Sequence, residues 1–171
     1  EGTETRTGFF VDCDPQKMER VVLNLVGNAI KFTGQGGTVR IFLDQDPDRS
    51  GCVRFMVTDN GPGISAEAIP RVTDRYFTVG SQPSGSGLGL AISKEIIERH
   101  EGSIQIESPP QGKDSGTAVT VSLPEAEPPS VLVVDDEDKV RELMAMQIRE
   151  EGYLVEEAAD GSQALDRIQN E

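Results

Sequence analysis

The sequence predicts an α/β protein in two parts. The first is a two-layer sandwich, in which helices cover one face of a mixed sheet, and the second is the beginning of a doubly wound parallel sheet. Three observations predict this. Between residues 7 and 123, two strong helical patterns alternate with pairs of strand-like runs. A proline-rich segment, PEAEPPS at 124–130, then interrupts the pattern. After it the order becomes strand, helix, strand, helix.

Three helices are expected in the first part. The first begins at Asp14-Pro15, because Asp is a good N-cap and Pro is tolerated at the first helical position. Apolar residues then recur at helical spacing as far as position 32. A second helix is expected over Leu88–His100, and a short one over Ser65–Ile69, where Pro70 would stop it.

Strands are expected where short apolar runs lie between turn signals. In the first part these runs are Thr7–Val11, Thr38–Leu43, Cys52–Val57, Ser103–Ile106 and Thr117–Leu123. In the second part, strands over Val131–Val134 and Tyr153–Val155 alternate with helices over Glu137–Glu151 and Gly161–Ile168. The pattern ends at Glu171 without a third strand, so we expect a truncated domain there.

Charge is distributed unevenly between the two parts. The chain has 16 basic and 30 acidic residues and a net charge of −14, and residues 125–171 hold 14 of the acidic but only 4 of the basic ones. This asymmetry predicts one domain over 1–124, a linker over 125–130 and a partial domain over 131–171. An acidic chain without a basic face is not expected to bind nucleic acid or a membrane surface.

The cysteines and the hydropathy indicate a cytoplasmic chain. Cys13 and Cys52 form no C-x-x-C pair, which is typical of buried free thiols in a reducing compartment. No apolar run reaches 18 residues, so no membrane span is expected.

A polar stripe runs along the first predicted helix. Arg20, Asn24, Asn28 and Lys31 recur at helical spacing and therefore share one face. A solvent-exposed face would also explain the stripe, but Glu or Lys would serve that purpose better than two asparagines. An asparagine oxygen is a suitable ligand for a hard cation such as Mg²⁺.

Two glycine-containing loops add to this stripe. DNGPGI at 59–64 directly follows a predicted strand; it is either an ordinary turn or a place where Asp59 accepts from an amine while the glycines admit a flat ring. GSGLGL at 85–90 opens the second helix, where backbone N–H groups favour an anion such as phosphate. Neither loop alone is specific evidence for a ligand-binding site.

Together, in this order and spacing, the stripe and the loops resemble the N, G1 and G2 boxes of the GHKL ATP-binding superfamily. The closest resemblance is to the catalytic domain of sensor histidine kinases, over NLVGNAIKFT, VTDNGPGI, GSGLGLAISKEIIERHEG and GTAVTVSLP. It covers nearly all of residues 8–124. The resemblance implies a Bergerat α/β sandwich that binds ATP and Mg²⁺ beneath a mobile lid.

The resemblance also implies roles for individual residues. Asn28 corresponds to the Mg²⁺ ligand, Asn24 to a second polar contact with the metal or the phosphates, and Lys31 to a phosphate contact. Asp59 corresponds to the acceptor for the adenine amino group, supported by Thr117. Arg75 stands where kinases often carry a basic lid residue that neutralises the γ-phosphate.

The remaining implied contacts come from the two loops. Gly61, Gly63 and Ile64 would form walls around the base. The triphosphate would be held by Gly85, Gly87 and Gly89 together with the amides of Leu88 and Leu90. The lid over Thr78–Ser84 is short and carries no Lys or Arg, and Thr73 stands where the family usually has an aromatic residue.

One position distinguishes between classes within the superfamily. ATPases of the gyrase and chaperone type carry a Glu one turn before the metal asparagine, as the base that activates water. Here that residue is Asn24, which cannot act as a base. Phosphoryl transfer to a histidine on a dimerisation domain, absent from this chain, is therefore favoured over hydrolysis. His100, the only histidine, is expected to be structural. Another GHKL ATPase, or a non-catalytic nucleotide-binding module, remains an alternative.

The second part of the chain carries a pair of adjacent carboxylates. Asp135 and Asp136 follow a buried-strand run, where sites form in doubly wound sheets, and a cation would relieve their repulsion. A solvated strand end would explain them equally well. The run through EEGYLVEEAADGSQALDRI resembles the start of a response-regulator receiver domain. The resemblance implies Mg²⁺ at the two aspartates, but the acceptor Asp at the end of a third strand is missing. The chain as a whole then resembles a fragment of a hybrid histidine kinase.

Overall fold

The computed structural model describes residues 8–79 and 85–169. They form two compact units. The N-terminal unit comprises Val11–Glu125. The C-terminal unit comprises residues from Ala126 onward, together with residues 8–10 of the described chain. Each unit is described by itself below.

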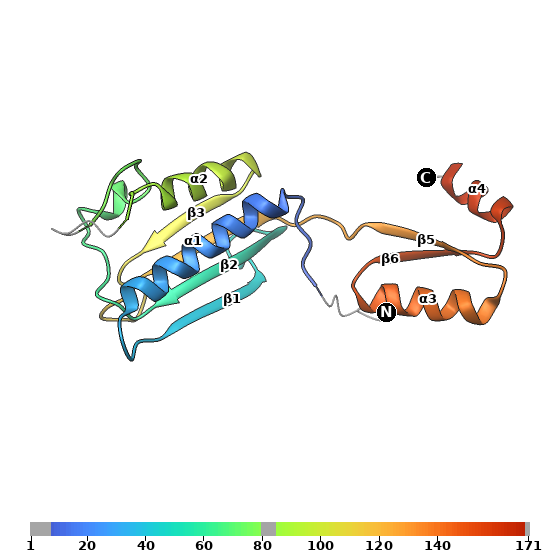
Figure 1. The fold of residues 1–171 in the computed structure, drawn as a ribbon, viewed down its shortest axis with the longest axis horizontal. Coiled ribbons are helices and arrows are strands. Elements are labelled where there is room, and N and C mark those ends of the chain that lie inside the picture. The colour runs from blue at the N-terminus through green and yellow to red at the C-terminus, as the bar shows by residue number, and fades with distance from the viewer. Residues whose placement is uncertain (1–7, 80–84, 170–171) are drawn as a thin grey trace. The chain divides into compact units, whose positions relative to one another are not determined.

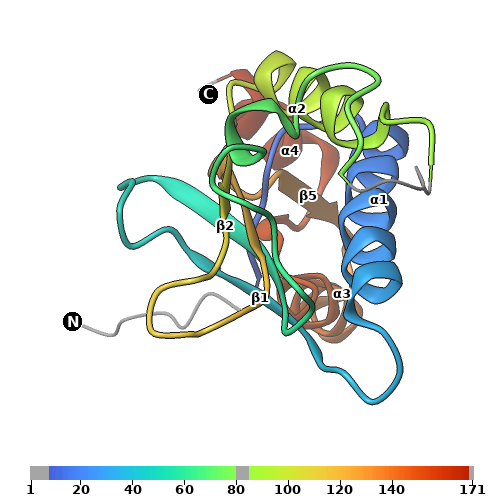
Figure 2. The ribbon, with the colours of Figure 1, turned by 90° about the vertical axis from the view of Figure 1, so that its left-hand side faces the viewer.

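The N-terminal unit is a two-layer sandwich, with helices α1 and α2 on one face of a four-stranded sheet (Figures 1 and 2). Its elements are α1 (Pro15–Thr33), β1 (Val39–Gln45), β2 (Cys52–Asp59), the 3₁₀ helix η1 (Ile69–Arg71), α2 (Gly89–Arg99), β3 (Ser103–Glu107) and β4 (Ala118–Pro124). The strand order is β1-β2-β4-β3. Helix α1 packs against β1 and β2, and α2 packs against β3.

The sheet is antiparallel throughout, so the prediction of a mixed sheet is wrong. Each neighbouring pair runs antiparallel: β1 with β2, β2 with β4, and β4 with β3. The connection through α2 does bring β3 back parallel to β2. However, β4 is inserted between these two strands, so they never pair directly.

Two smaller expectations are also wrong. No strand forms over residues 8–11, and Thr7 lies outside the described residues. Instead the Phe10 carbonyl accepts one hydrogen bond from Ala126 N–H, and the Phe10 ring contacts that of Tyr153 at 6.2 Å between centroids. The short helix expected before Pro70 is replaced by η1, which contains this proline in its first turn, where its missing N–H costs nothing.

The core of the N-terminal unit lies between the helices and the sheet. Val21 and Leu25 of α1, Ile97 of α2, Val57 of β2 and Val121 of β4 are all at most 2% exposed. At about 1.5–3 kcal/mol for each buried aliphatic side chain, this layer dominates the stability of the unit. Leu25 and Val57 of this core also line the cavity described below.

The start of α1 follows the sequence prediction. The Asp14 carboxylate caps the helix by accepting a hydrogen bond from Lys17 N–H at 3.0 Å, and this lowers the pKa of Asp14. His100, at the end of α2, is structural as expected. Its Nε2 accepts a hydrogen bond from Asp14 N–H at 3.0 Å, and its Nδ1 lies 2.7 Å from the Ile96 carbonyl oxygen. The histidine thereby joins the start of α1 to the end of α2.

The C-terminal unit has the predicted strand-helix-strand-helix order. Its elements are β5 (Ser130–Val134), α3 (Asp138–Glu150), β6 (Leu154–Ala158) and α4 (Gly161–Gln169). The two strands pair in parallel, and the helices lie on opposite sides of them (Figure 1). Among the described residues this unit has no third strand.

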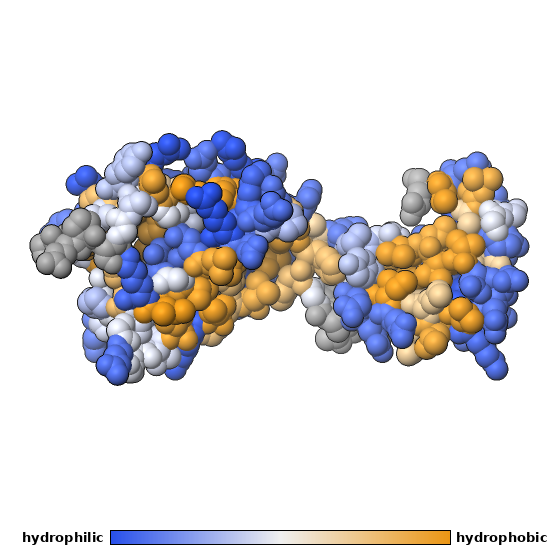
Figure 3. All heavy atoms as spheres, in the orientation of Figure 1, coloured by the Kyte–Doolittle hydropathy of each residue, from blue (hydrophilic) through white to orange (hydrophobic). Residues whose placement is uncertain are grey.

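Large apolar side chains remain exposed on both units (Figure 3). Leu23 and Ile30 of α1 are more than 60% exposed, as is Ile168 of α4. Within residues 8–79 and 85–169, no helix is long and apolar enough to cross a membrane.

Candidate functional site

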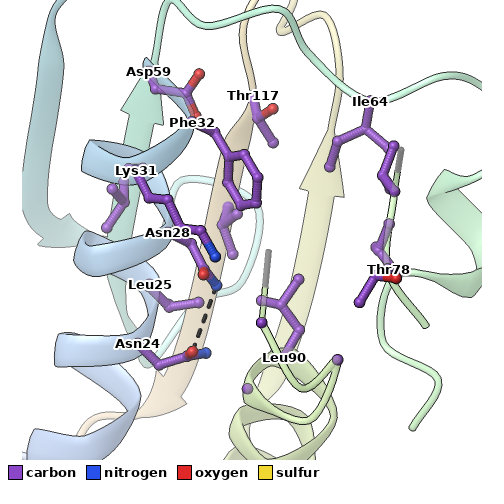
Figure 4. Close-up of a pocket in the computed structure, with 18 of the residues that line it drawn as sticks. Asn24, Leu25, Asn28, Lys31, Phe32, Asp59, Ile64, Thr78, Leu90 and Thr117 are labelled. Carbon is purple, nitrogen blue, oxygen red and sulfur yellow. Dashed lines mark hydrogen bonds between the residues drawn. The ribbon is translucent and has the colours of Figure 1, made fainter. Parts of the chain in front are cut away.

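A cavity of about 430 Å³ opens between α1, the sheet and the start of α2 (Figure 4). Side chains of α1 form one wall, and Ile64 and Thr78 lie across from them. Asp59 and Thr117 lie at one end of the cavity, whereas Asn24 and Leu90 lie at the other. Segments that are far apart in the sequence therefore meet at a single site.

The polar stripe of α1 supplies the first set of groups. Asn24, Asn28 and Lys31 line the cavity, whereas Arg20, one turn earlier, is exposed and does not. The part of the stripe from Asn24 to Lys31 is therefore a wall of the site, in which the two asparagines are half-buried and Lys31 is exposed. Asn24 Nδ2 donates to Ser93 Oγ at 2.9 Å, and Asn28 Nδ2 lies 3.5 Å from Asn24 Oδ1 (Figure 4).

Lys31 brings positive charge to the same wall. Its ammonium group lies 5.2 Å from the centre of the Phe32 ring, a cation–π distance. A Cβ atom at Gly85 would lie 3.4 Å from Lys31 Nζ, so the amine is next to the glycine loop. A polyanion in the cavity would therefore meet a cation beside that loop.

Asp59 marks the other end of the cavity. It is the last residue of β2 and is 9% exposed. Its Oδ1 accepts a hydrogen bond from Gly61 N–H at 2.8 Å, which fixes the carboxylate. Its own N–H donates to the carbonyl of Thr117, the residue directly before β4, at 2.9 Å. A fixed carboxylate at the end of a partly apolar cavity can recognise an amino group.

Two residues that the sequence reasoning missed shape this end. Ser108 Oγ accepts from Ile64 N–H and donates to the Gly116 carbonyl, both at 2.7 Å. A Cβ atom at Gly116 would lie 2.1 Å from the Asp59 carbonyl oxygen, so no side chain fits there. The position of Gly116 directly before Thr117 was a usable signal, whereas nothing local to Ser108 indicated its role.

The glycine loop closes the end of the cavity near Asn24. Gly85, Gly87, Gly89 and Leu90 line the cavity. Gly89 permits a close approach, because a Cβ atom there would lie 2.1 Å from Asn24 Oδ1. The glycine at this position therefore leaves room for the amide of the opposite helix.

The structure also places predicted residues away from the cavity. Gly61 is buried behind Asp59, and Leu88 is the N-cap residue of α2; neither lines the cavity. Arg75 is 67% exposed and forms an ion pair with Glu95 of α2 at 2.9 Å. Most of the predicted lid, residues 80–84, lies outside the described part of the chain.

The paired aspartates belong to the C-terminal unit. Asp135 is half-buried, and its Oδ1 accepts a hydrogen bond from Glu137 N–H at 2.8 Å, whereas Asp136 is exposed. Within the described residues, no group of three or more His, Cys, Asp or Glu side chains is placed to hold a metal ion. Metal binding at this pair remains a prediction.

Comparison with protein families finds a match over residues 13–127. The family is described as histidine kinase-, DNA gyrase B-, and HSP90-like ATPase, and the match covers the N-terminal unit almost end to end. This chain belongs to that ATPase family. The catalytic ATPase domain expected from the three sequence boxes is thus confirmed at the level of the family.

A sensor protein and a histidine kinase are similar to this chain in sequence. The sensor protein EvgS of Escherichia coli K12 is 34% identical over 94% of this chain, but the match spans only 15% of EvgS. The circadian input-output histidine kinase CikA of Synechococcus elongatus is 33% identical over 91% of this chain and 22% of CikA. This chain therefore spans a small part of its relatives.

Solved structures agree with this placement. The mycobacterial sensor histidine kinase MprB matches with a TM-score of 0.62 and 35% identity, over 67% of this chain and 76% of that one. Full-length ShkA in complex with AMPPNP matches with a TM-score of 0.53 and 28% identity, over 88% of this chain and 33% of that one. The ATPase fold of the N-terminal unit is thereby shown.

Proposed function

We propose that the cavity binds Mg-ATP, and that the chain transfers the γ-phosphoryl group to a histidine on a dimerisation domain. One observation carries the proposal. A single cavity has a fixed carboxylate, Asp59, at one end and two asparagines, a lysine and a glycine loop toward the other. That order suits a ligand with an amine-bearing ring at one end and phosphates at the other.

The base would bind at the Asp59 end. The carboxylate would accept a hydrogen bond from the adenine amino group, with Thr117 beside it. Apolar side chains, including Leu25 of α1, Val119 of β4 and Ile64 from the segment after β2, line the cavity and would contact the ring. Burial of these apolar surfaces contributes most of the affinity of such pockets, while the polar group supplies specificity.

The phosphates would bind between α1 and the glycine loop. Lys31 would neutralise part of their charge, and the backbone of residues 85–90 would surround them. Asn28 offers a neutral oxygen, and Mg²⁺ is commonly held by one or two protein oxygens together with substrate phosphates. The donor set therefore fits a cation that enters with the nucleotide. When bound, the cation would offset charge on the phosphate oxygens.

Transfer, and not hydrolysis, follows from the residue at position 24. An asparagine amide cannot take a proton from water, so this wall of the cavity lacks a general base. The acceptor would be the unprotonated nitrogen of a neutral histidine ring. Its lone pair forms the new N–P bond while ADP leaves with the electrons of the broken P–O bond, and the other ring nitrogen gives up its proton. Arg75 would reach the γ-phosphate only by leaving Glu95.

For the C-terminal unit we propose the start of a receiver domain. Its parallel β5 and β6, its flanking helices and the aspartates at the end of β5 support this. The EvgS match, which covers 94% of the chain, also extends past residue 127. With this unit over 131–171 and the linker over 125–130, the parent protein would pass phosphate from its histidine to a receiver aspartate.

Calorimetric titration with ATP, with and without Mg²⁺, tests the proposal. Asp59→Asn should weaken binding at least tenfold, because hydrogen bonds to charged groups contribute about 1.5–3 kcal/mol. Asp46→Asn is the matched control: Asp46 is equally buried, at 8%, but lies outside the cavity. Equal affinity of the wild type and Asp59→Asn would contradict the adenine assignment.

A second assay tests the reaction. With ATP and a histidine-bearing dimerisation domain supplied in trans, the chain should label that domain, while phosphate release in its absence stays slow. Rapid steady-state release of phosphate would instead favour an ATPase. Tight binding without labelling or release would favour a non-catalytic nucleotide-binding module.

A further inference from the structure

Ser93 is a polar residue in an apolar setting. It lies in the middle of α2 and is 2% exposed, in the same helix as the core residues Ile96 and Ile97. A buried hydroxyl without a partner costs about 1–3 kcal/mol. The partner here is Asn24 Nδ2, 2.9 Å away across the interface between α1 and α2.

This hydrogen bond sets the orientation of the Asn24 amide. A carboxamide has a donor end and an acceptor end, so turning Nδ2 toward Ser93 turns Oδ1 the other way. Asn24 Oδ1 then lies beside Gly89, which leaves room for it, and 3.5 Å from Asn28 Nδ2. With its nitrogen directed at Asn24, the Asn28 amide has its oxygen at the opposite end.

We propose that Ser93 is a positioning residue for the magnesium-dependent part of nucleotide binding. It holds the Asn24 amide, and through it the Asn28 amide, so that the Asn28 oxygen is available to a cation. Ser93 itself does not line the cavity and acts only through its neighbours. The inference rests on the proposed function, because it concerns a cation that enters with ATP.

The test compares ATP affinity with and without Mg²⁺ in wild type and Ser93→Ala. The measured quantity is the dissociation constant without Mg²⁺ divided by the dissociation constant with Mg²⁺. This ratio should fall about tenfold in Ser93→Ala, which is the lower end of the loss of metal affinity expected when a residue that supports a metal ligand is removed. Ser122→Ala is the matched control, because Ser122 is also buried, at 5%, and its hydroxyl bonds to Asp46 outside the cavity. It should lose stability but keep the ratio.

Further variants separate positioning from packing. Ser93→Thr keeps the hydroxyl and should have the same ratio as the wild type. Ser93→Cys has a weak acceptor of similar volume and should have a lower ratio. It replaces Ser93→Ala in the test if that variant does not fold. In an Asn24→Ala background, removing the hydroxyl should change the ratio no further, because non-additivity identifies residues that act together.

The outcomes distinguish the inference from the proposed function. If the wild type shows no Mg²⁺-dependent binding of ATP, the proposed function fails. If the wild type shows it and Ser93→Ala keeps the same ratio, only the role of Ser93 is overturned. A ratio that falls as far in Ser122→Ala as in Ser93→Ala would also overturn it, since the loss would then reflect stability.

Discussion

At the scale of single residues, Asn28 and Asp59 are proposed to contact different parts of the ligand. Their substitution should therefore affect ATP binding in different ways. We expect Asn28→Ala to weaken ATP binding in the presence of Mg²⁺ by at least tenfold and to change metal-free binding little. The reason is that the amide oxygen is proposed to contact the cation and not the base. Titration of ATP with and without Mg²⁺ measures both affinities.

Asn60→Ala provides the control for this substitution. The Asn60 side chain accepts a hydrogen bond from Thr38 N–H outside the cavity, so its loss should leave both affinities unchanged. An equal loss of affinity with and without Mg²⁺ in Asn28→Ala would contradict the metal role.

Gly89 makes a second prediction at this scale. In Gly89→Ala the new methyl group would meet Asn24 Oδ1 at 2.1 Å and displace the amide. ATP affinity should therefore fall about tenfold or more. Gly27→Ala is the control, since nothing lies within 4 Å of its Cβ position in α1. Alanine there should stabilise the helix by up to about 1 kcal/mol and leave affinity unchanged.

At the scale of elements, the β1–β2 connection contains an acid-sensitive contact. The Ser122 hydroxyl donates to the Asp46 carboxylate, and Asp48 N–H donates to it at 3.0 Å. These hydrogen bonds, with the Ser122 hydroxyl the larger contributor, lower the pKa of Asp46 from its ordinary value of 3.8. A lowered pKa means stability that is present at neutral pH and lost as the pH falls below about 4.

Urea unfolding of wild type and Asp46→Asn between pH 3 and 7 checks this. The variant should be less stable at pH 7, and the difference in the free energy of unfolding should shrink toward pH 3. A difference that does not change with pH would show that the ionised carboxylate contributes nothing at this contact.

The contact between α1 and α2 through His100 predicts a purely structural phenotype. His100→Ala removes the acceptor for Asp14 N–H, so the free energy of unfolding should fall by about 1–2 kcal/mol. The cavity is lined by other parts of both helices, so ATP affinity should not change. Chemical denaturation and calorimetry measure the two effects, and a loss of affinity at unchanged stability would contradict this role.

At the scale of the whole molecule, the cavity belongs to one unit. Among the residues that the structure describes, those that line it fall between Asn24 and Val119, within the N-terminal unit. A chain that ends at Glu125 should therefore bind ATP within about twofold of the affinity of the whole chain. Calorimetry on both chains measures this, and a larger loss would show that residues after 125 contribute to the site.

Local signals predicted most elements, because caps, glycines and hydrophobic periodicity act within a few residues. Asp14-Pro15 marked the start of α1, and Gly152 lies just beyond the end of α3. The direction of strand pairing was not predictable in this way. Whether β4 lies between β2 and β3 depends on the pairing of β2 with β4, which joins residues such as Thr58 and Ala118, and no short run of sequence encodes it.

The same distinction between local and long-range signals applies to the residues of the candidate site. Asn28, Lys31 and Asp59 could be named because their chemistry and spacing are local. Ser93 and Ser108 could not, because each acts on a residue more than 40 positions away. A serine in a helix or at a strand end is too common to signal a role. Arg75 was placed near the phosphates by resemblance, whereas its observed partner is Glu95.

The single hydroxyl of Ser108 has a thermodynamic consequence for ligand binding. It joins the segment after β2 to the segment before β4, beside the proposed base site. The conformational entropy of these segments is thus lost when the chain folds, not when a ligand arrives. Preorganisation of this kind leaves more of the contact free energy as affinity. Adenosine alone should therefore bind with little ordering of the protein at this end.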